Sequence, residues 1–180
     1  PMEDMRGSDL VAAITRRIEG LGVLQIRSDG VDPTLWLKVD SFSLMQALAS
    51  LAARLADEFG ITRAELRLSA ADTRAHLDLV WSGQVMSTET VMSWEMDPMR
   101  IGTDTTPLTV RDVVDRHGGA FWFERERVRH EAFFRFLLPL AAAQETAETP
   151  PLPARAERPE YYDFDLFKTT EQARDMEDRR

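Results

Sequence analysis

The stretch that most constrains the fold is residues 107–140, "PLTVRDVVDRHGGAFWFERERVRHEAFFRFLLPL". Its first part predicts a helix with Pro107 in the first turn and a stop at Gly118 and Gly119. Three valines form the buried stripe of that helix: Val110, Val113 and Val114. "AFWFER" and "AFFRFLLPL" then predict a closing antiparallel pair of strands. His117 stands at the junction, so it either does chemistry or only marks the turn.

Two earlier segments have the apolar spacing of amphipathic helices. The first covers residues 8–19, with Ser8 as its expected cap. Its apolar face consists of Leu10, Val11, Ile14 and Ile18. The second begins at Asp40 or Ser41 and ends at Gly60, a residue type favoured just after a helix. Its apolar positions recur every three or four residues: Leu44, Leu48, Leu51, Leu55 and Phe59.

Short strands are predicted for "GVLQIRS", "TLWLKVD", "AELRLSA" and "AHLDLVW". The last of these alternates, so Leu77, Leu79 and Trp81 share one side. From Ser82 to Pro107 we expect little regular structure except a short helix in "STETVMSWEM", capped by Ser87. The layout predicts an α+β fold, a two-layer α/β sandwich in which helices cover one face of a mixed sheet.

The composition excludes several classes of function. A net charge of −9 argues against direct nucleic-acid contact, because phosphate binding needs clustered Lys and Arg. No stretch is long and apolar enough for a membrane span. With no cysteine there is no thiolate chemistry or Cys-based zinc site, and the three histidines, His76, His117 and His130, lack a metal-ligand spacing. We expect a cytoplasmic domain, whose parent protein could still be membrane-anchored.

The composition changes after Leu140. Residues 1–140 are expected to form the folded domain, and the Pro, Ala and Glu-rich residues 141–160 a linker. Residues 161–180 begin with "YYDFDLF", whose five large apolar side chains predict docking on the domain or on a neighbouring chain. The opening "PMEDMRG" is not typical of a natural terminus, so we expect a larger parent protein.

From about Asp9 to Leu140, the order of these elements resembles the ATP-binding domain of sensor histidine kinases, a superfamily that includes the ATPase domains of gyrase and of a heat-shock chaperone. The most specific match is helix, His-Gly-Gly, aromatic strand and Phe-x-Phe-x-Leu-Pro-Leu. A second match is "LWLKVDSFSLMQALASLAARLADEFG", similar to the strand, Asp and nucleotide-site helix of that family. The resemblance implies a Bergerat-like ATPase fold.

The resemblance also implies where Mg-ATP would bind, and the metal position differs here. Counted from Asp40, the two Asn positions of the family fall on Ser50 and Arg54. The second of these coordinates the metal in the family, and an arginine there would repel Mg²⁺. We expect Arg54 to reach solvent or to pair with Asp57.

The other nucleotide contacts also depart from the pattern of the family. Its Asp-x-Gly-x-Gly motif, which reads adenine, falls on "WSGQV". Trp81 replaces the Asp, Gly83 remains, and Val85 replaces the second Gly. The last phosphate loop of the family, Gly-x-Gly-Leu, falls around "DTTPL", which contains Thr105 and Thr106 and no glycine, and Gly102 lies just upstream.

Each lost charge-assisted contact costs about 1.5–3 kcal/mol, so three losses would weaken Mg-ATP binding by roughly a thousandfold or more. In the family the His-Gly-Gly lies away from the phosphates, so we interpret His117, Gly118 and Gly119 as a structural signature. We therefore expect no catalytic residue, no metal site and no cofactor, unless this reading of the pocket is wrong.

The leading hypothesis is a degenerate ATPase-like domain that acts as a regulatory or interaction module. Its partners would be other domains of the parent protein or a separate protein. An active ATP-binding kinase domain with divergent motifs is the alternative, although the first helix carries no phosphoacceptor His. A third is a homodimerisation scaffold with a contact surface of four residues: Met92, Trp94, Met96 and Met99.

The tail adds a separate resemblance. "RPEYYDFDLF" is similar to a segment that joins such degenerate domains to a 3′–5′ exonuclease of the DNA polymerase III epsilon type in certain bacterial proteins. In such proteins the exonuclease carries an Asp-x-Glu metal-binding motif; the sequence has this spacing only within "DMED", which we interpret as a solvated acidic run and not as a two-metal site. Any nuclease activity would therefore belong to the parent protein.

Overall fold

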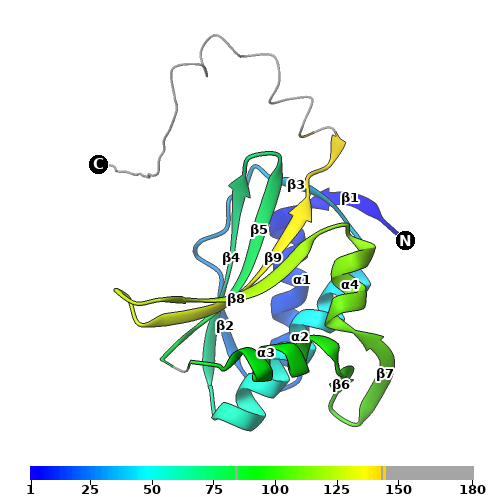
Figure 1. Ribbon diagram of the computed structural model, residues 1–180. Coiled ribbons are helices and arrows are strands. Elements are labelled where there is room, and N and C mark those ends of the chain that lie inside the picture. The colour runs from blue at the N-terminus through cyan, green and yellow to red at the C-terminus, as the bar shows by residue number, and fades with distance from the viewer. Residues whose placement is uncertain (84, 143, 145–180) are drawn as a thin grey trace. The chain divides into compact units, whose positions relative to one another are not determined.

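The computed structural model describes residues 1–83, 85–142 and 144, and Pro1–Gln144 form one compact unit. The predicted linker and the YYDFDLF segment therefore lie almost entirely outside the described residues. Four helices and nine strands follow one another along the described chain (Figure 1). They are β1 (Glu3–Arg6), α1 (Gly7–Gly20), β2 (Gln25–Arg27), β3 (Trp36–Val39), α2 (Ser41–Phe59), β4 (Arg63–Ala71), β5 (Arg74–Ser82), α3 (Thr88–Met96), β6 (Pro98–Ile101), β7 (Asp104–Thr109), α4 (Val110–Arg116), β8 (Ala120–Glu126) and β9 (Glu131–Pro139).

Five strands form the main sheet in the order β2-β4-β5-β9-β8. Only β2 and β4 run parallel, and the other neighbours are antiparallel, so the sheet is mixed. The helices lie on one face of this sheet (Figure 1). The prediction of a two-layer α+β sandwich is confirmed. Two small antiparallel pairs, β1-β3 and β6-β7, lie beside it.

The register of the sheet explains where the core lies. One row of paired residues crosses four strands: Leu66, Leu79, Phe134 and Phe123. The next parallel row is Leu68, Leu77, Phe136 and Phe121. These rows face the helices, whose predicted apolar positions are buried against them. On the other face of the sheet, Asp78 is buried, and its carboxylate accepts two hydrogen bonds from the Arg135 guanidinium.

Helix α1 begins one residue earlier than expected, and Ser8 is not its cap. The capping position is Arg6, without a side-chain hydrogen bond. Strand β1 runs directly into the helix, and the Gly7 N–H donates to the carbonyl of Leu35. A side chain at position 7 would overlap Leu68, so the junction requires glycine. The tertiary contact replaces the local cap.

Helix α2 has the predicted bounds. The Asp40 carboxylate accepts from the Ser43 N–H, and Gly60 ends the helix in the left-handed conformation with a φ of 68°. The four leucines of its predicted stripe are fully buried, and Phe59 is partly buried. This helix spans the domain and positions a different group of polar residues at each end.

The segment from Ser82 to Pro107 is more regular than expected. Ser87 caps α3 as predicted, but the hairpin β6-β7 was not foreseen. Pro107 lies in β7 rather than in the first turn of α4. That helix starts at Val110, because Thr109 and Asp112 form a reciprocal capping box.

None of the helices in the described part of the chain is long and apolar enough to cross a bilayer.

Candidate functional site

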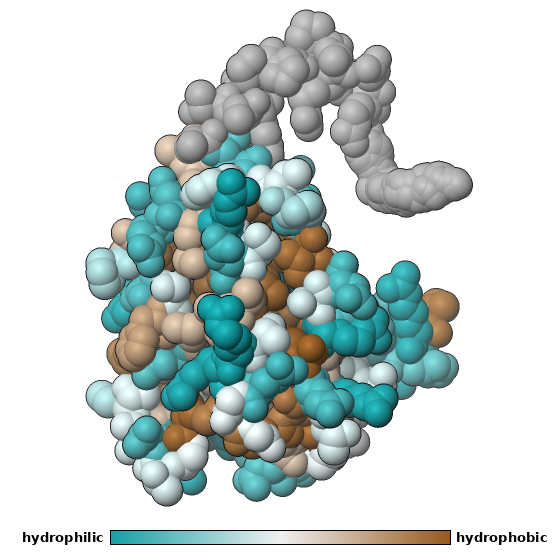
Figure 2. All heavy atoms as spheres, turned by 180° about the vertical axis from the view of Figure 1, so that it is seen from behind, coloured by the Kyte–Doolittle hydropathy of each residue, from teal (hydrophilic) through white to brown (hydrophobic). Residues whose placement is uncertain are grey.

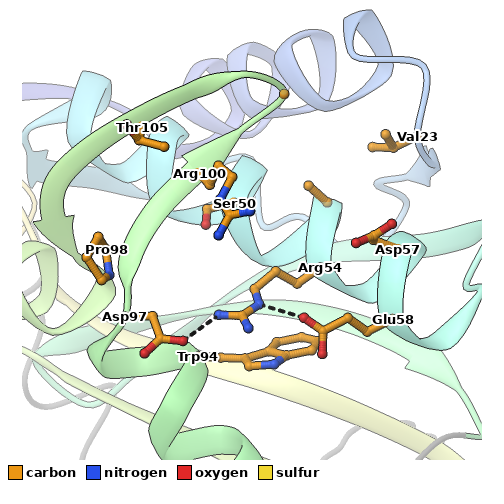
Figure 3. A pocket seen from close by; sticks show the side chains of 12 residues that line it. Val23, Ser50, Arg54, Asp57, Glu58, Trp94, Asp97, Pro98, Arg100 and Thr105 are labelled. Atoms are coloured by element: carbon orange, nitrogen blue, oxygen red, sulfur yellow. Dashed lines mark hydrogen bonds and ion pairs between the residues drawn. The ribbon is translucent and has the colours of Figure 1, made fainter.

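A cavity of about 510 Å³ lies between the C-terminal half of α2, α3 and the β6-β7 hairpin (Figure 3). Its lining consists of Val23, Ser50, Ala53, Arg54, Asp57, Glu58, Trp94, Asp97, Pro98, Arg100, Gly102 and Thr105. Five of these were predicted pocket positions: Ser50, Arg54, Asp57, Gly102 and Thr105. These five residues are far apart in the chain, and the structure places them around one cavity.

Arg54 is the most constrained side chain of the cavity. Its Nε donates to the Glu58 carboxylate at 3.0 Å, and its Nη1 donates to Asp97 at 3.2 Å. The guanidinium carbon lies 5.0 Å from the centre of the Trp94 ring, so the cation also stacks on an indole (Figure 3). The expected pairing with Asp57 is wrong. Glu58 replaces it because side chains four residues apart lie on the same face of a helix.

The charges in the lining nearly balance. Three carboxylates, on Asp57, Glu58 and Asp97, face two guanidinium groups, on Arg54 and Arg100. Arg100 is exposed and forms no ion pair with any described residue. Arg54 is held by two carboxylates from different elements. The cavity therefore contains one neutralised cation and one free cation.

The three positions of the predicted base-reading motif do not line this cavity. Trp81 is buried in the core, where its ring lies 5.1 Å from that of Phe134, and its indole N–H finds no hydrogen-bond partner among the described residues. Gly83 has a positive φ of 95°, and Val85 is exposed. No carboxylate occurs at these positions, and the indole points into the sandwich.

The predicted phosphate loop is part of a hairpin instead of an open turn. Thr105 and Thr106 belong to β7, and the turn itself contains Gly102 with a φ of 64°. The Thr106 hydroxyl accepts from the Leu108 N–H. Thr105 lines both the cavity of about 510 Å³ and a smaller hollow of about 60 Å³, and Thr106 lines only the smaller one, together with Arg17.

His117 lies at the other end of α2 and is buried. Its Nδ1 is 2.8 Å from the Val113 carbonyl, and its Nε2 is 2.9 Å from the Asp40 N–H. A carbonyl can only accept and an N–H can only donate, so the ring is neutral with its proton on Nδ1. Burial lowers the pKa of His117, in agreement with this tautomer.

The His117 imidazole thereby links the C-terminal end of α4 to the N-terminal end of α2. Arg116 donates to the Asp40 carboxylate at 2.7 Å. Burial would raise the pKa of Asp40, but the hydrogen bonds from Arg116 and Ser43 outweigh it and hold the pKa below its ordinary value. Gly118 follows with a φ of 58°, and a side chain at Gly119 would overlap the Leu137 carbonyl. Both ring nitrogens of His117 are thus bonded to backbone groups.

The four residues proposed as a dimer surface fall into two groups. Trp94 and Met99 are buried, and the Trp94 ring stacks on that of Phe59 with ring centres 5.5 Å apart. Met92 and Met96 are exposed. The four side chains therefore do not form one surface. Among the described residues, no group of three or more His, Asp or Glu side chains could hold a metal ion.

Several lining residues were not foreseen from the sequence: Glu58, Trp94, Asp97 and Arg100. Helical spacing could have identified Glu58 as a partner of Arg54. Asp97 and Arg100 depend on how the unforeseen β6 packs, and no local pattern indicates that.

No family model matches the sequence, and no curated protein matches it. Solved structures do match. The catalytic domain of the histidine kinase ThkA has a TM-score of 0.57 at 16% identity, and the match covers 80% of this chain and 99% of that one. The histidine kinase domain of the E. coli osmosensor EnvZ has a TM-score of 0.55 at 19% identity, with coverages of 79% and 91%.

The ATP-binding domain of PrrB from Mycobacterium tuberculosis has a TM-score of 0.57 at 15% identity, and the match covers 78% of this chain and 98% of that one. At such identities the likeness extends to the arrangement of helices and strands. It covers most of the residues that the structure describes, in agreement with the resemblance of residues 9–140. The chain has the fold of histidine kinase ATP-binding domains.

Proposed function

We propose that this chain is a histidine-kinase-like ATPase domain that does not bind Mg-ATP in the manner of its structural relatives and acts as a regulatory or interaction module of a larger protein. The observation that carries the proposal is the arrangement around Arg54. A cation occupies the position where the resemblance implies a metal-coordinating Asn, and Glu58 and Asp97 both hold it. Binding a metal there would bring two cations together and would require both ion pairs to open.

The base anchor supports the same conclusion. The position of the adenine-reading Asp carries Trp81, whose side chain is packed among Phe123 and Phe134. An indole offers one N–H donor and no acceptor, so it cannot accept the hydrogen bond of an adenine amino group.

The lid region supports it further. The resemblance to histidine kinase domains implies a mobile nucleotide lid around Trp94, which here belongs to α3. Here Trp94 anchors α3 in the core, and Arg54 bonds to Asp97 at the start of β6. These contacts oppose the lid movement that would admit a triphosphate.

An active ATP-binding domain with divergent motifs is the second candidate, and one observation favours it. The cavity of about 510 Å³ is not filled by apolar side chains, and the free Arg100 lies in its lining. ShkA, a structural relative with a TM-score of 0.54 at 20% identity, has been solved in complex with AMPPNP. An ATP site with altered contacts would use this cavity.

The interaction role is supported by a different relative. ThkA has been solved in complex with the response regulator protein TrrA, so a domain of this fold can belong to a protein assembly. We extend the proposal to the fusion that the tail resembles, in which the parent protein would carry a 3′–5′ exonuclease. Its basis is the sequence of residues 158–167 alone.

Isothermal titration of the full chain with Mg-ATP, repeated with EDTA, separates the two candidates. We expect no metal-dependent heat at a protein concentration that would detect a Kd of about 100 μM. The variant Arg54→Asn is the matched control, because it restores the residue type of the metal position. Micromolar, EDTA-sensitive binding by the unaltered chain would reject the proposal in favour of the active domain.

A further inference from the structure

Strand β8 forms a free edge of the main sheet. It pairs with β9 on one side, and no described strand pairs with its other side. Alternate backbone N–H and C=O groups of an edge strand point outward without a partner. At the opposite edge, β2 is only three residues long, and farther along β4 Gly30 and Asp32 form backbone hydrogen bonds with Leu68. Only one long edge of the described sheet is thus open to another strand.

The side chains along β8 divide it into two halves. Its first half carries Phe121, Trp122 and Phe123, all buried or partly buried. The second half leads into the turn before β9, which projects from the body of the fold (Figure 1). In the opposite view the same projection is mostly hydrophilic, with an apolar tip (Figure 2). The turn contains Val128, which is 85% exposed.

Three arginines, Arg125, Arg127 and Arg129, lie in this turn region. All three are exposed, and none forms an ion pair with a described residue. Two of the three nearby carboxylates pair with other arginines, since Glu124 lies 3.9 Å from Arg135 and Glu131 lies 3.0 Å from Arg67, so among the described residues only Glu126 is left to offset the three positive charges. In a chain of net charge −9, this concentration of unpaired positive charge favours an acidic partner.

We propose that the free edge of β8 binds an extended segment of a partner protein in which acidic residues alternate with large apolar ones, as an added antiparallel strand. The antiparallel direction places the N-terminal, acidic part of the segment beside the three arginines and its apolar C-terminal part beside Phe121 and Phe123. Backbone hydrogen bonds would supply affinity, and alternate side chains would supply specificity.

A second copy of β8 fits this edge less well. In a two-fold antiparallel pair with both copies facing the same way, odd-numbered residues lie opposite odd-numbered residues. No odd position from 119 to 129 is acidic. The arginines at 125, 127 and 129 would therefore gain no carboxylate partner. A separate acidic segment satisfies them.

A suitable probe is the labelled peptide EYYDFDLF, because it has the required alternation. The same letters occur at residues 160–167, so the assay uses the full chain with Phe164→Asp and Leu166→Asp, which leaves the probe as the competent segment. Fluorescence anisotropy should give a Kd of about 10–100 μM. The permuted peptide FLDFDYYE, which is the probe in reverse order, has equal charge and composition but places its apolar end beside the arginines, and we expect it to bind at least about tenfold more weakly.

A second binding experiment tests the role of charge with a variant in which three arginines, Arg125, Arg127 and Arg129, are all replaced by Glu. It should weaken the probe by about tenfold or more, and the charge-reversed peptide KYYKFKLF should bind this variant better than it binds the unaltered arginines. Recovery by the reversed peptide also shows that the variant is folded.

Hydrogen exchange then locates the peptide. Amides of residues 120–126 should exchange about tenfold more slowly when the probe is bound, while those of β9, paired on both sides, should not change. No binding, equal binding of the permuted peptide, or protection elsewhere than β8 would each overturn the proposal.

Discussion

The two ends of helix α2 hold polar groups in different ways. At the N-terminal end, Asp40 and His117 are buried. Both nitrogens of the His117 ring are bonded to backbone groups, namely the Asp40 N–H and the Val113 carbonyl. At the C-terminal end, Arg54 and Glu58 are partly exposed, and they meet Asp97 across a cavity. The first end therefore fixes the fold, while the second end shapes a site.

This difference explains which part of the family pattern is kept. A buried imidazole that satisfies two backbone groups cannot be exchanged without leaving both unsatisfied. Ion pairs at a partly exposed site contribute little to stability, so residues there can change with only a small cost to the fold. Under the proposed function, the residues around His117 keep the pattern that the resemblance implies, whereas the position of Arg54 departs from it.

The largest effect on stability is expected for Trp94, which lines the cavity at the C-terminal end of α2. Trp94→Ala should lower the free energy of unfolding by about 3–5 kcal/mol, because the indole is only 3% exposed and packs on Phe59 and Phe134. Urea unfolding measures the change. Met92→Ala on the same helix, at a side chain that is 59% exposed, should stay within about 0.5 kcal/mol. A loss below about 1 kcal/mol for Trp94→Ala would mean that this floor of the cavity is not part of the core.

At the first end, His117→Ala should cost about 2–3 kcal/mol in the same assay, because the Asp40 N–H and the Val113 carbonyl would lose their partner in a buried position. His130→Asn is the control, since His130 is exposed and Asn tolerates its positive φ. If the two variants were equally stable, His117 would not have the structural role that the geometry indicates.

Acidification should weaken the fold through His76, which is partly buried, and His117, which is buried. Burial, with a smaller effect of Arg135, lowers the pKa of His76 from 6.5 to about 4, and burial also lowers the pKa of His117. The unfolded chain binds protons that the folded chain does not, so stability is complete above pH 6.5 and falls as the pH decreases toward 4.

Urea unfolding at pH 7.5 and pH 5 should differ by about 1–2 kcal/mol, a figure reduced for partial solvent exposure. His76→Gln should remove its share of that difference. Equal or greater stability at the lower pH would contradict this account of the two imidazoles.

The smallest effect is expected for Arg54→Ala, about 0.5–1 kcal/mol, because its ion pairs are partly exposed. Arg111→Ala is a matched control with a similar pair of carboxylate partners, Glu95 and Asp115. A loss above about 3 kcal/mol for Arg54→Ala alone would show that the second end is as structural as the first.

Most of the fold could be predicted from local pattern. The leucine spacing of α2, its Asp40 cap and Gly60 stop, and the strands on either side of the closing turn are all periodic or have known cap chemistry. The burial of Trp81 was also predictable, because it alternates with Leu77 and Leu79. The hairpin β6-β7 was not, since its short strands carry prolines and no clear alternation, and they pack on α2.

The candidate site was predicted only in part for the same reason. Residues on α2 could be assigned by counting along one helix, and Ser50 and Arg54 do line the cavity. Asp97 and Arg100 come from the hairpin, so their positions depend on tertiary packing. The first end shows the same limit: no local pattern joins His117 to the Asp40 N–H, 77 residues away.

The most direct test of the central claim is a crystal structure of the full chain soaked in Mg-AMPPNP. The account predicts that the Arg54 guanidinium stays between Glu58 and Asp97, over the Trp94 ring, with no metal bound beside it. A nucleotide in the cavity with its metal coordinated by residues of α2, and Arg54 turned away, would contradict it.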